Sequence, residues 1–184
     1  NFPKDIDAAD AIRRITERIY DFYVQHNLLD ELKAEPGKRF TANGVIYSYA
    51  RNEVWQVGDC QCIIDNLYSS NEKEIDAIMA DVRAVVNEVA LLGGATMKDL
   101  ESHDPGREFI YPFLQKQALL QNCPIQGQQF SFSVFDGFPI QMEQVKVFPV
   151  GDAKEVVLAS DGYPHLYSTL YASECYLADI LEKD

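Results

Sequence analysis

The strand pattern of this chain centres on residues 53–64, Glu53-Val54-Trp55-Gln56-Val57-Gly58-Asp59-Cys60-Gln61-Cys62-Ile63-Ile64. β-Branched and aromatic residues favour a strand here, and Gly58-Asp59 interrupts it with the residues of a bend or bulge. Residues 40–50 alternate apolar and polar side chains, and the turn pair Arg51-Asn52 separates the two runs. The sequence therefore predicts two antiparallel strands joined by a tight turn.

Helical spacing of apolar residues predicts a long helix on each side of this strand pair. The first helix begins at a cap provided by Asp5 or Asp7, and its apolar stripe continues to about Leu32. The second covers residues 75–89, where Ile and Val recur at steps of three and four, and Gly93-Gly94 ends it.

The remaining chain alternates between the two kinds of pattern. Its predicted elements are, in order, a turn at 104–106, a helix over 109–121, a hairpin from 130–134 and 142–150, a strand over 155–160, and a helix from Leu166 to Leu181. This order predicts an α+β fold in which antiparallel sheet is covered by paired antiparallel helices. The length fits a single domain over residues 1–184.

The composition indicates a folded, acidic chain. Its 184 residues include 16 Lys and Arg and 29 Asp and Glu, for a formal net charge of −13 at pH 7. This negative charge disfavours nonspecific attraction to nucleic-acid phosphates and to anionic lipid. No run of apolar residues approaches the roughly 20 residues that span a bilayer. Four scattered cysteines are too few for a disulfide framework. We expect a cytoplasmic protein with reduced thiols and neither a nucleic-acid nor a membrane partner.

Two predicted strands deliver an aspartate at their tips, beside a glycine that allows close approach of a ligand. They are residues 57–60, Val-Gly-Asp-Cys, and residues 158–162, Leu-Ala-Ser-Asp-Gly. Carboxylates arranged in this way suit hard divalent cations such as Mg²⁺ and Mn²⁺. Asp136-Gly137 and Gly151-Asp152 have no such partner motif, and we interpret them as turns.

These motifs resemble those of a known family. Val-Trp-Gln-Val-Gly-Asp-Cys (residues 54–60) and Val-Val-Leu-Ala-Ser-Asp-Gly (residues 156–162) are similar to motifs of the metal-dependent protein phosphatases, the type 2C serine/threonine phosphatase family. The order of elements over residues 7–184 fits as well. The resemblance implies an antiparallel β-sandwich flanked by antiparallel helix pairs, with two Mg²⁺ or Mn²⁺ ions, and a weaker third, at one edge. It further implies that Asp161 is a metal ligand and Asp59 an accessory one.

The resemblance also implies an activity. The family hydrolyses phosphoserine and phosphothreonine monoesters with a metal-activated water, so the expected partner is a phosphorylated protein and no protein nucleophile is needed. A proton donor to the leaving oxygen would help, and His165, four residues after Asp161, is the histidine nearest to it in sequence. The alternative for His165 is a partly exposed residue at the start of the last helix, and we assign no catalytic residue.

The chain also departs from the family pattern. The family's Asp-Gly-x-Gly motif would precede Asn1, and its closing Asp-Asn or Asp-Asp motif would follow Asp184, so we expect a domain truncated at both ends. Cys60 stands where Ser is usual, and Gln61 where Arg is common. We therefore expect weak or no activity from this chain alone. Two other functions remain open: an inactive phosphatase-like binding or scaffold module, and an acidic interaction domain without phosphoryl chemistry.

Overall fold

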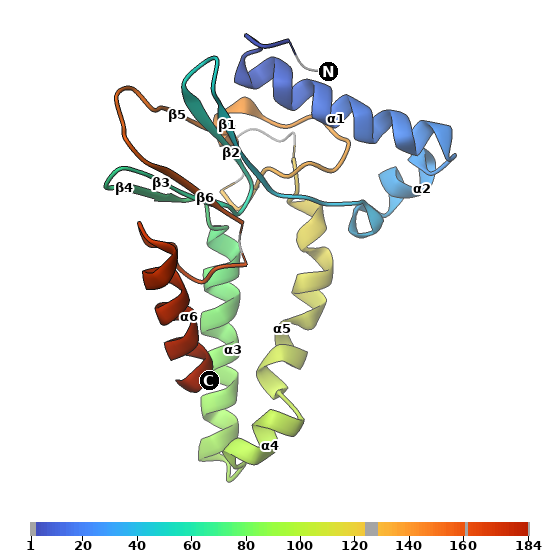
Figure 1. Cartoon of the computed structure of the whole chain (residues 1–184). Helices are drawn as coiled ribbons and strands as arrows, with labels where there is room; N and C mark the ends of the chain where they lie inside the picture. The colour runs from blue at the N-terminus through green and yellow to red at the C-terminus, as the bar shows by residue number, and fades with distance from the viewer. Residues whose placement is uncertain (1–2, 124–128, 161, 184) are drawn as a thin grey trace.

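The computed structural model describes residues 3–123, 129–160 and 162–183. Over these residues the fold is α+β, with two three-stranded antiparallel sheets and accompanying helices (Figure 1). The elements are, in order, α1 (Ala8–Gln25), α2 (Leu29–Ala34), the 3₁₀ turn η1 (Pro36–Lys38), β1 (Gly44–Ser48), β2 (Glu53–Val57), β3 (Gln61–Ile64), β4 (Leu67–Ser70), α3 (Glu74–Leu92), α4 (Met97–Ser102), α5 (Pro105–Lys116), η2 (Gln117–Leu119), η3 (Met142–Gln144), β5 (Lys146–Pro149), β6 (Val156–Ala159) and α6 (Leu170–Lys183). The predicted α+β class is confirmed.

The first sheet has the strand order β1-β2-β5. β1 and β2 form the predicted antiparallel pair, with Ile46 opposite Trp55. In the turn between them Asn52 has φ 52°, a left-handed conformation that Asn tolerates better than most residues. β5 pairs with the other edge of β2, where Val147 lies opposite Trp55. β2 is therefore the central strand of this sheet.

The second sheet has the order β4-β3-β6, and the chain enters it through a bend at Gly58. Gly58 has φ +73°, and a Cβ atom there would lie 2.2 Å from Asn43 Oδ1, so this bend requires glycine. The prediction of one interrupted strand over residues 53–64 is wrong, because β2 ends at Val57 and β3 begins at Gln61 in the other sheet. The bend therefore transfers the chain between sheets.

The two sheets share a buried core. Val54 of β2 joins Cys62 and Ile64 of β3 in one cluster of buried residues, and Leu158 of β6 packs against it. Alternate side chains of a strand point to opposite faces, so the neighbour of Val54 in the sequence, Trp55, faces away from this cluster. Both faces of the first sheet are thus available for packing.

Helix α1 covers the outer face of the first sheet (Figure 1). Ala8 and Ala11 pack on Trp55, and Ile12 packs with Val57. Ile15 and Ile19, which belong with Ile12 to the apolar stripe predicted from the sequence, pack against the same cluster, whereas Phe22 at the end of that stripe is 41% exposed. The packing of α1 therefore follows directly from its sequence.

The first helix begins where the sequence predicts but ends earlier. The carboxylate of Asp7 accepts a hydrogen bond from the backbone N–H of Asp10 at 2.8 Å and caps α1. The helix ends at Gln25, although its apolar pattern continues to about Leu32. Asn27 has φ 56°, which breaks the helix, and α2 begins two residues later.

The hairpin predicted from residues 130–134 and 142–150 does not form. Phe132 makes an isolated parallel bridge with Gln121, and β5 pairs with β2 instead. A period of two identifies an extended, half-buried segment, but it does not name the strand that pairs with it. The local conformation was therefore easier to predict than the pairing.

Helices α3, α4 and α5 form an arm that extends away from the sheets, with α4 at its far end (Figure 1). The predicted turn Asp104-Pro105-Gly106 instead begins α5, where Asp104 is the N-cap and Pro105 the first helical residue. Gly106 allows α5 to approach α3 closely, since a Cβ atom there would lie 2.4 Å from the carbonyl oxygen of Arg83. Among the described residues, no helix is long and apolar enough to cross a bilayer.

Acidification should weaken the contact between α3 and α5 through Asp104. The backbone N–H of Arg107 and the guanidinium of Arg83 lower the pKa of Asp104 to about 2. Because this folded-state pKa is depressed, the stabilisation is complete above the unfolded-state pKa of about 3.9 and is lost as the pH falls towards 2. Asp104→Asn keeps a capping oxygen, so its unfolding free energy should depend less on pH in this window. Urea unfolding followed by circular dichroism at several pH values tests this. An equal change of unfolding free energy with pH in both proteins would contradict it.

Candidate functional site

The strand ends that border the two aspartate motifs meet at one end of the second sheet. β3 and β6 are antiparallel, with Gln61 opposite Ala159. The buried side chain of Gln61 also holds the chain beyond β6, because its Nε2 donates to the carbonyl of Tyr163 at 2.5 Å and its Oε1 accepts from the N–H of Leu166 at 2.9 Å. Leu166 precedes α6 and is buried, rather than lying in the last helix as predicted.

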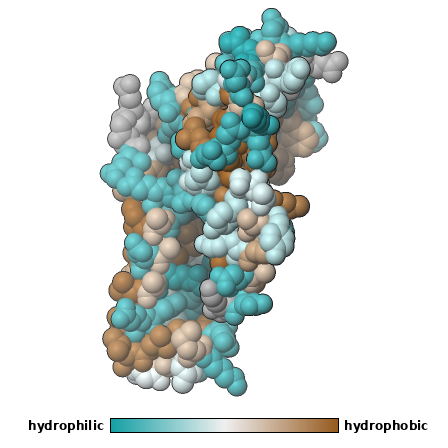
Figure 2. Space-filling view, turned by 60° about the vertical axis from the view of Figure 1, so that its left-hand side comes forward, coloured by the Kyte–Doolittle hydropathy of each residue, from teal (hydrophilic) through white to brown (hydrophobic). Residues whose placement is uncertain are grey.

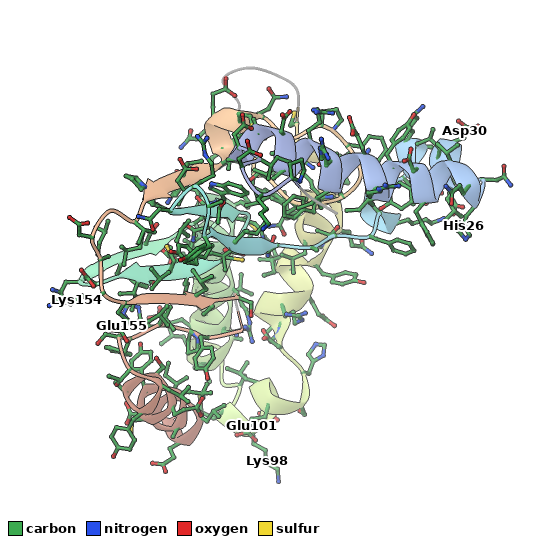
Figure 3. The ribbon with its side chains drawn as sticks, turned by 45° about the horizontal axis from the view of Figure 1, so that its top comes forward. His26, Asp30, Lys98, Glu101, Lys154 and Glu155 are labelled. Atoms are coloured by element: carbon green, nitrogen blue, oxygen red, sulfur yellow. The ribbon has the colours of Figure 1, made fainter. Side chains whose placement is uncertain are left out.

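Of the two carboxylates predicted as metal ligands, the structure describes one. Asp59 lies two residues before the start of β3 and is described. Asp161 follows the end of β6 by two residues in the sequence and lies outside the described residues. Lys154 and Glu155, labelled in Figure 3, precede β6 and mark the opposite end of that strand.

Asp59 is held in place by an ion pair and by the backbone beside it. Its carboxylate lies 2.8 Å from the ammonium of Lys73, and the two side chains are only 15% and 18% exposed. The carbonyl of Gly58 accepts a hydrogen bond from Asn71 Nδ2 at 2.9 Å, and the N–H of Gly58 donates to Ser133 Oγ at 3.3 Å. The bend that presents Asp59 is therefore anchored to two other segments of the chain.

Lys73 carries its positive charge at neutral pH despite its partial burial. Burial lowers the pKa of Lys73, but the hydrogen bond and charge of Asp59, together with those of Asp76, more than offset this, so the pKa lies above its usual value. The ammonium also lies 5.1 Å from the centre of the Phe132 ring. A fixed positive charge thus occupies one side of the Asp59 carboxylate.

A pocket of about 260 Å³ adjoins Lys73. Its walls come from the bend, from the start of α3 and from the segment around residue 132, and include Gly58, Asn71, Lys73, Phe132, Ser133 and Gln144. The Oε1 atom of Gln144 is buried and accepts no hydrogen bond from the described residues. The pocket therefore combines the Lys73 cation with two exposed acidic residues, Glu72 and Glu74, in its lining.

The described residues do not by themselves fit a divalent cation. Within residues 3–123, 129–160 and 162–183, no group of three or more His, Cys, Asp or Glu side chains is placed to hold a metal ion. Asp59 contributes one carboxylate, which already contacts the ammonium of Lys73. A metal centre at this end of the sheet would need Asp161 and further oxygen ligands.

The three histidines are engaged in packing or surface contacts. The ring of His165 packs against Tyr68 and Tyr167, at centroid distances of 4.6 and 4.8 Å. The ring of His26, the C-cap residue of α1, stacks on Phe22, and His103 lies 3.4 Å from the carboxylate of Glu108. These contacts and the partial exposure of His165 favour a packed surface residue over a proton donor, but its predicted place at the start of the last helix is wrong, because α6 begins at Leu170.

The most deeply buried carboxylate belongs to Asp136, which the sequence pattern assigned to a turn. Its side chain has no exposed surface and accepts four hydrogen bonds. The donors are Arg39 Nη1 at 3.1 Å, Gln121 Nε2 and Asn122 Nδ2 at 2.7 Å each, and the N–H of Phe138 at 2.9 Å. Asp136 thus connects three separate segments of the chain in a structural network.

Sequence reasoning found Asp59 but missed the residues that surround it. Lys73 looks like an ordinary solvent-facing lysine before a helix, and Asn71 looks like a loop residue. The only local signal is the glycine at 58, because a residue forced into a left-handed bend indicates a close approach of other segments. The glycine alone does not indicate which segments of the chain approach it.

No protein-family model, no curated protein and no solved structure matches this chain. The likeness to the phosphatase family therefore depends on the two motifs at residues 54–60 and 156–162 and on the order of elements.

Proposed function

We propose that this chain forms a type 2C phosphatase-like domain that hydrolyses phosphoserine and phosphothreonine monoesters with Mg²⁺ or Mn²⁺. The observation that carries the proposal is the register of β3 and β6. It sets Gln61 opposite Ala159, so the start of β3 after Asp59 and the end of β6 before Asp161 lie together at one end of the second sheet. The hydrogen bonds from Gln61 to the segment beyond β6 support the same convergence. The shared core of the two sheets supports a β-sandwich of the phosphatase kind.

In this proposal Asp161 is a metal ligand and Asp59 supports a weaker ion. Bound Mg²⁺ or Mn²⁺ would supply an activated water and neutralise charge on the phosphoryl oxygens. Lys73 orients the carboxylate of Asp59 and offsets its charge, so that it presents its remaining lone pairs in a fixed direction. The acidic chain favours a phosphoprotein that approaches with a basic segment.

Replacement of Asp161 by alanine tests the proposal directly. Mn²⁺ is titrated by calorimetry into the intact domain that contains these residues, because weak or no activity is expected from this chain alone, and hydrolysis of p-nitrophenyl phosphate is followed in parallel. We expect saturable Mn²⁺ binding, and turnover that falls at least about 100-fold in Asp161→Ala. The matched control is Asp152→Ala, an exposed aspartate in another Gly-Asp turn, which should leave both quantities unchanged. Equal rates in wild type and Asp161→Ala, or no Mn²⁺ binding, would refute the proposal.

One observation favours a second candidate, a phosphatase-like binding module without catalysis. The Lys73 ammonium lies 2.8 Å from Asp59 and supplies, without a metal, a positive charge beside that carboxylate. Such a site would be stable without ions and would recognise a ligand rather than hydrolyse it. The two candidates differ in how the protein should respond to the loss of Lys73.

Lys73→Gln should strengthen Mn²⁺ binding about tenfold if Asp59 supports an ion, because the competing positive charge is removed. The same calorimetric titration measures it. Lys154→Gln removes an equal charge at the opposite end of β6 and should change the affinity little. In a binding module neither variant would bind Mn²⁺, and Lys73→Gln would only lose the ion pair with Asp59.

A further inference from the structure

Helix α3 carries an apolar stripe with the spacing of a coiled coil. Its members recur at alternating steps of three and four residues, and we call them the α3 seam: Ile75, Ile78, Val82, Val85, Val89 and Leu92. This is the heptad pattern by which two helices pack along one another. α3 is 19 residues long, enough for almost three heptads. The seam therefore has the length and periodicity to receive another helix.

The α3 seam is exposed over most of its length. Val85, Val89 and Leu92 are 60%, 63% and 83% exposed. α5 contacts a different side of α3, where Arg83 pairs with Asp104 and Asn87 accepts a hydrogen bond from the N–H of Gly106. Figure 2 shows hydrophobic residues on the surface of the lower, helical part of the molecule. None of the described helices therefore covers the seam between Val85 and Leu92.

Acidic residues border the seam along one side. Glu74, Asp81 and Glu88 are seven residues apart and exposed, so they form a row parallel to the seam. Glu74 also accepts a hydrogen bond from Gln129 Nε2. The other side of the seam is bordered by the half-buried Met79 and Val86, which carry no charge. The row is therefore a one-sided negative border on an apolar face.

This border identifies the chemistry of the partner. If a second copy of α3 packed antiparallel, the two acidic rows would face and repel each other. If it packed parallel, the carboxylates of each copy would face Met79 and Val86 of the other, which offer no positive charge to pair with them. An anionic membrane surface would meet the same repulsion. A helix whose own apolar seam is flanked by Lys or Arg would pair with the row at every heptad.

We propose that the α3 seam binds an amphipathic helix with basic residues beside its apolar stripe. The proposal is independent of the phosphatase-like function, because the partner would contact α3 from Asp81 to Leu92, beyond Glu74, which lines the pocket beside Lys73. The partner would cover Val85, Val89 and Leu92, and its basic residues would lie opposite Asp81 and Glu88.

Two designed peptides test the proposal. Both are 21-residue helices with Leu at the seam positions; one carries Lys at the flanking positions and the other Glu. Binding of each labelled peptide to the full chain is measured by fluorescence anisotropy. We expect the Lys peptide to bind at least about tenfold more tightly than the Glu peptide. Equal affinities, or no binding of the Lys peptide, would overturn the proposal.

Variants of exposed residues locate the binding without disturbing the fold. Val85→Gln combined with Val89→Gln should weaken the Lys peptide at least about tenfold. Asp81→Lys combined with Glu88→Lys should reverse the preference, so that the Glu peptide binds more tightly. Unchanged affinities in both double variants would overturn the proposal. So would a concentration-dependent dimer in sedimentation equilibrium that Val85→Gln with Val89→Gln abolishes, since a second copy would then be the occupant.

Discussion

Replacement of Asp136 by alanine is expected to lower the free energy of unfolding by about 3–5 kcal/mol. The carboxylate is fully buried and accepts hydrogen bonds from Arg39, Gln121, Asn122 and the N–H of Phe138. Without it, the guanidinium of Arg39 loses its buried counter-charge, and the two amide groups lose an acceptor that water cannot readily replace. Urea unfolding followed by circular dichroism measures the change.

The destabilisation caused by Asp136→Ala should also affect the candidate site. Ser133, which accepts the hydrogen bond from Gly58, lies three residues before Asp136 in the same segment. We therefore expect the Asp136→Ala protein to expose the pocket beside Lys73 to solvent and to exchange amide hydrogens there faster. Asp152→Ala, at an exposed Gly-Asp turn, is the control and should change the unfolding free energy by less than about 0.5 kcal/mol. A loss below about 1 kcal/mol in Asp136→Ala would contradict the network's importance.

Trp55→Ala is expected to cost about 3–5 kcal/mol of unfolding free energy. Trp55 is 3% exposed and lies between the first sheet and α1, where Ala8 and Ala11 pack on it. Its indole Nε1 also donates to Glu53 Oε2 at 2.9 Å. The substitution would leave a large cavity under α1, because small alanines cannot fill the space that the indole occupied.

Trp55 is the only tryptophan, so its replacement removes the tryptophan fluorescence, and circular dichroism is the appropriate probe. Tyr49→Ala is a matched aromatic control, since Tyr49 is 88% exposed and should contribute less than about 0.5 kcal/mol. If both variants lost the same stability, Trp55 would not be the anchor of α1.

The elements that depend on local chemistry were predictable. The cap at Asp7, the turn at Asn52 and the helical spacing of α3 each depend on a few neighbouring residues. The antiparallel pair of β1 and β2 followed because a short turn brings two consecutive strands alongside one another. The predicted hairpin in the last third failed because β2 was the better partner for β5.

The candidate site was predictable only in part. The motif around Asp59 marked a strand end and a glycine bend, and these are present. That Lys73 contacts Asp59 depends on how β4 and the start of α3 return past the bend. Nothing in the spacing of these two residues distinguishes a partner from a solvated side chain.

The amino-acid sequence by itself determined the capped first helix, the strand pair around Asn52 and the helical spacing of α3, because each depends on residues close together in the chain, and the order of such elements determined the α+β class. The tertiary structure alone decided that Gly58 passes the chain from one sheet to the other, that Asp136 is buried among donors, and that Lys73 lies against Asp59. These contacts join segments whose separation in sequence carries no periodicity, so they are selected by packing and by the need to pair buried polar groups.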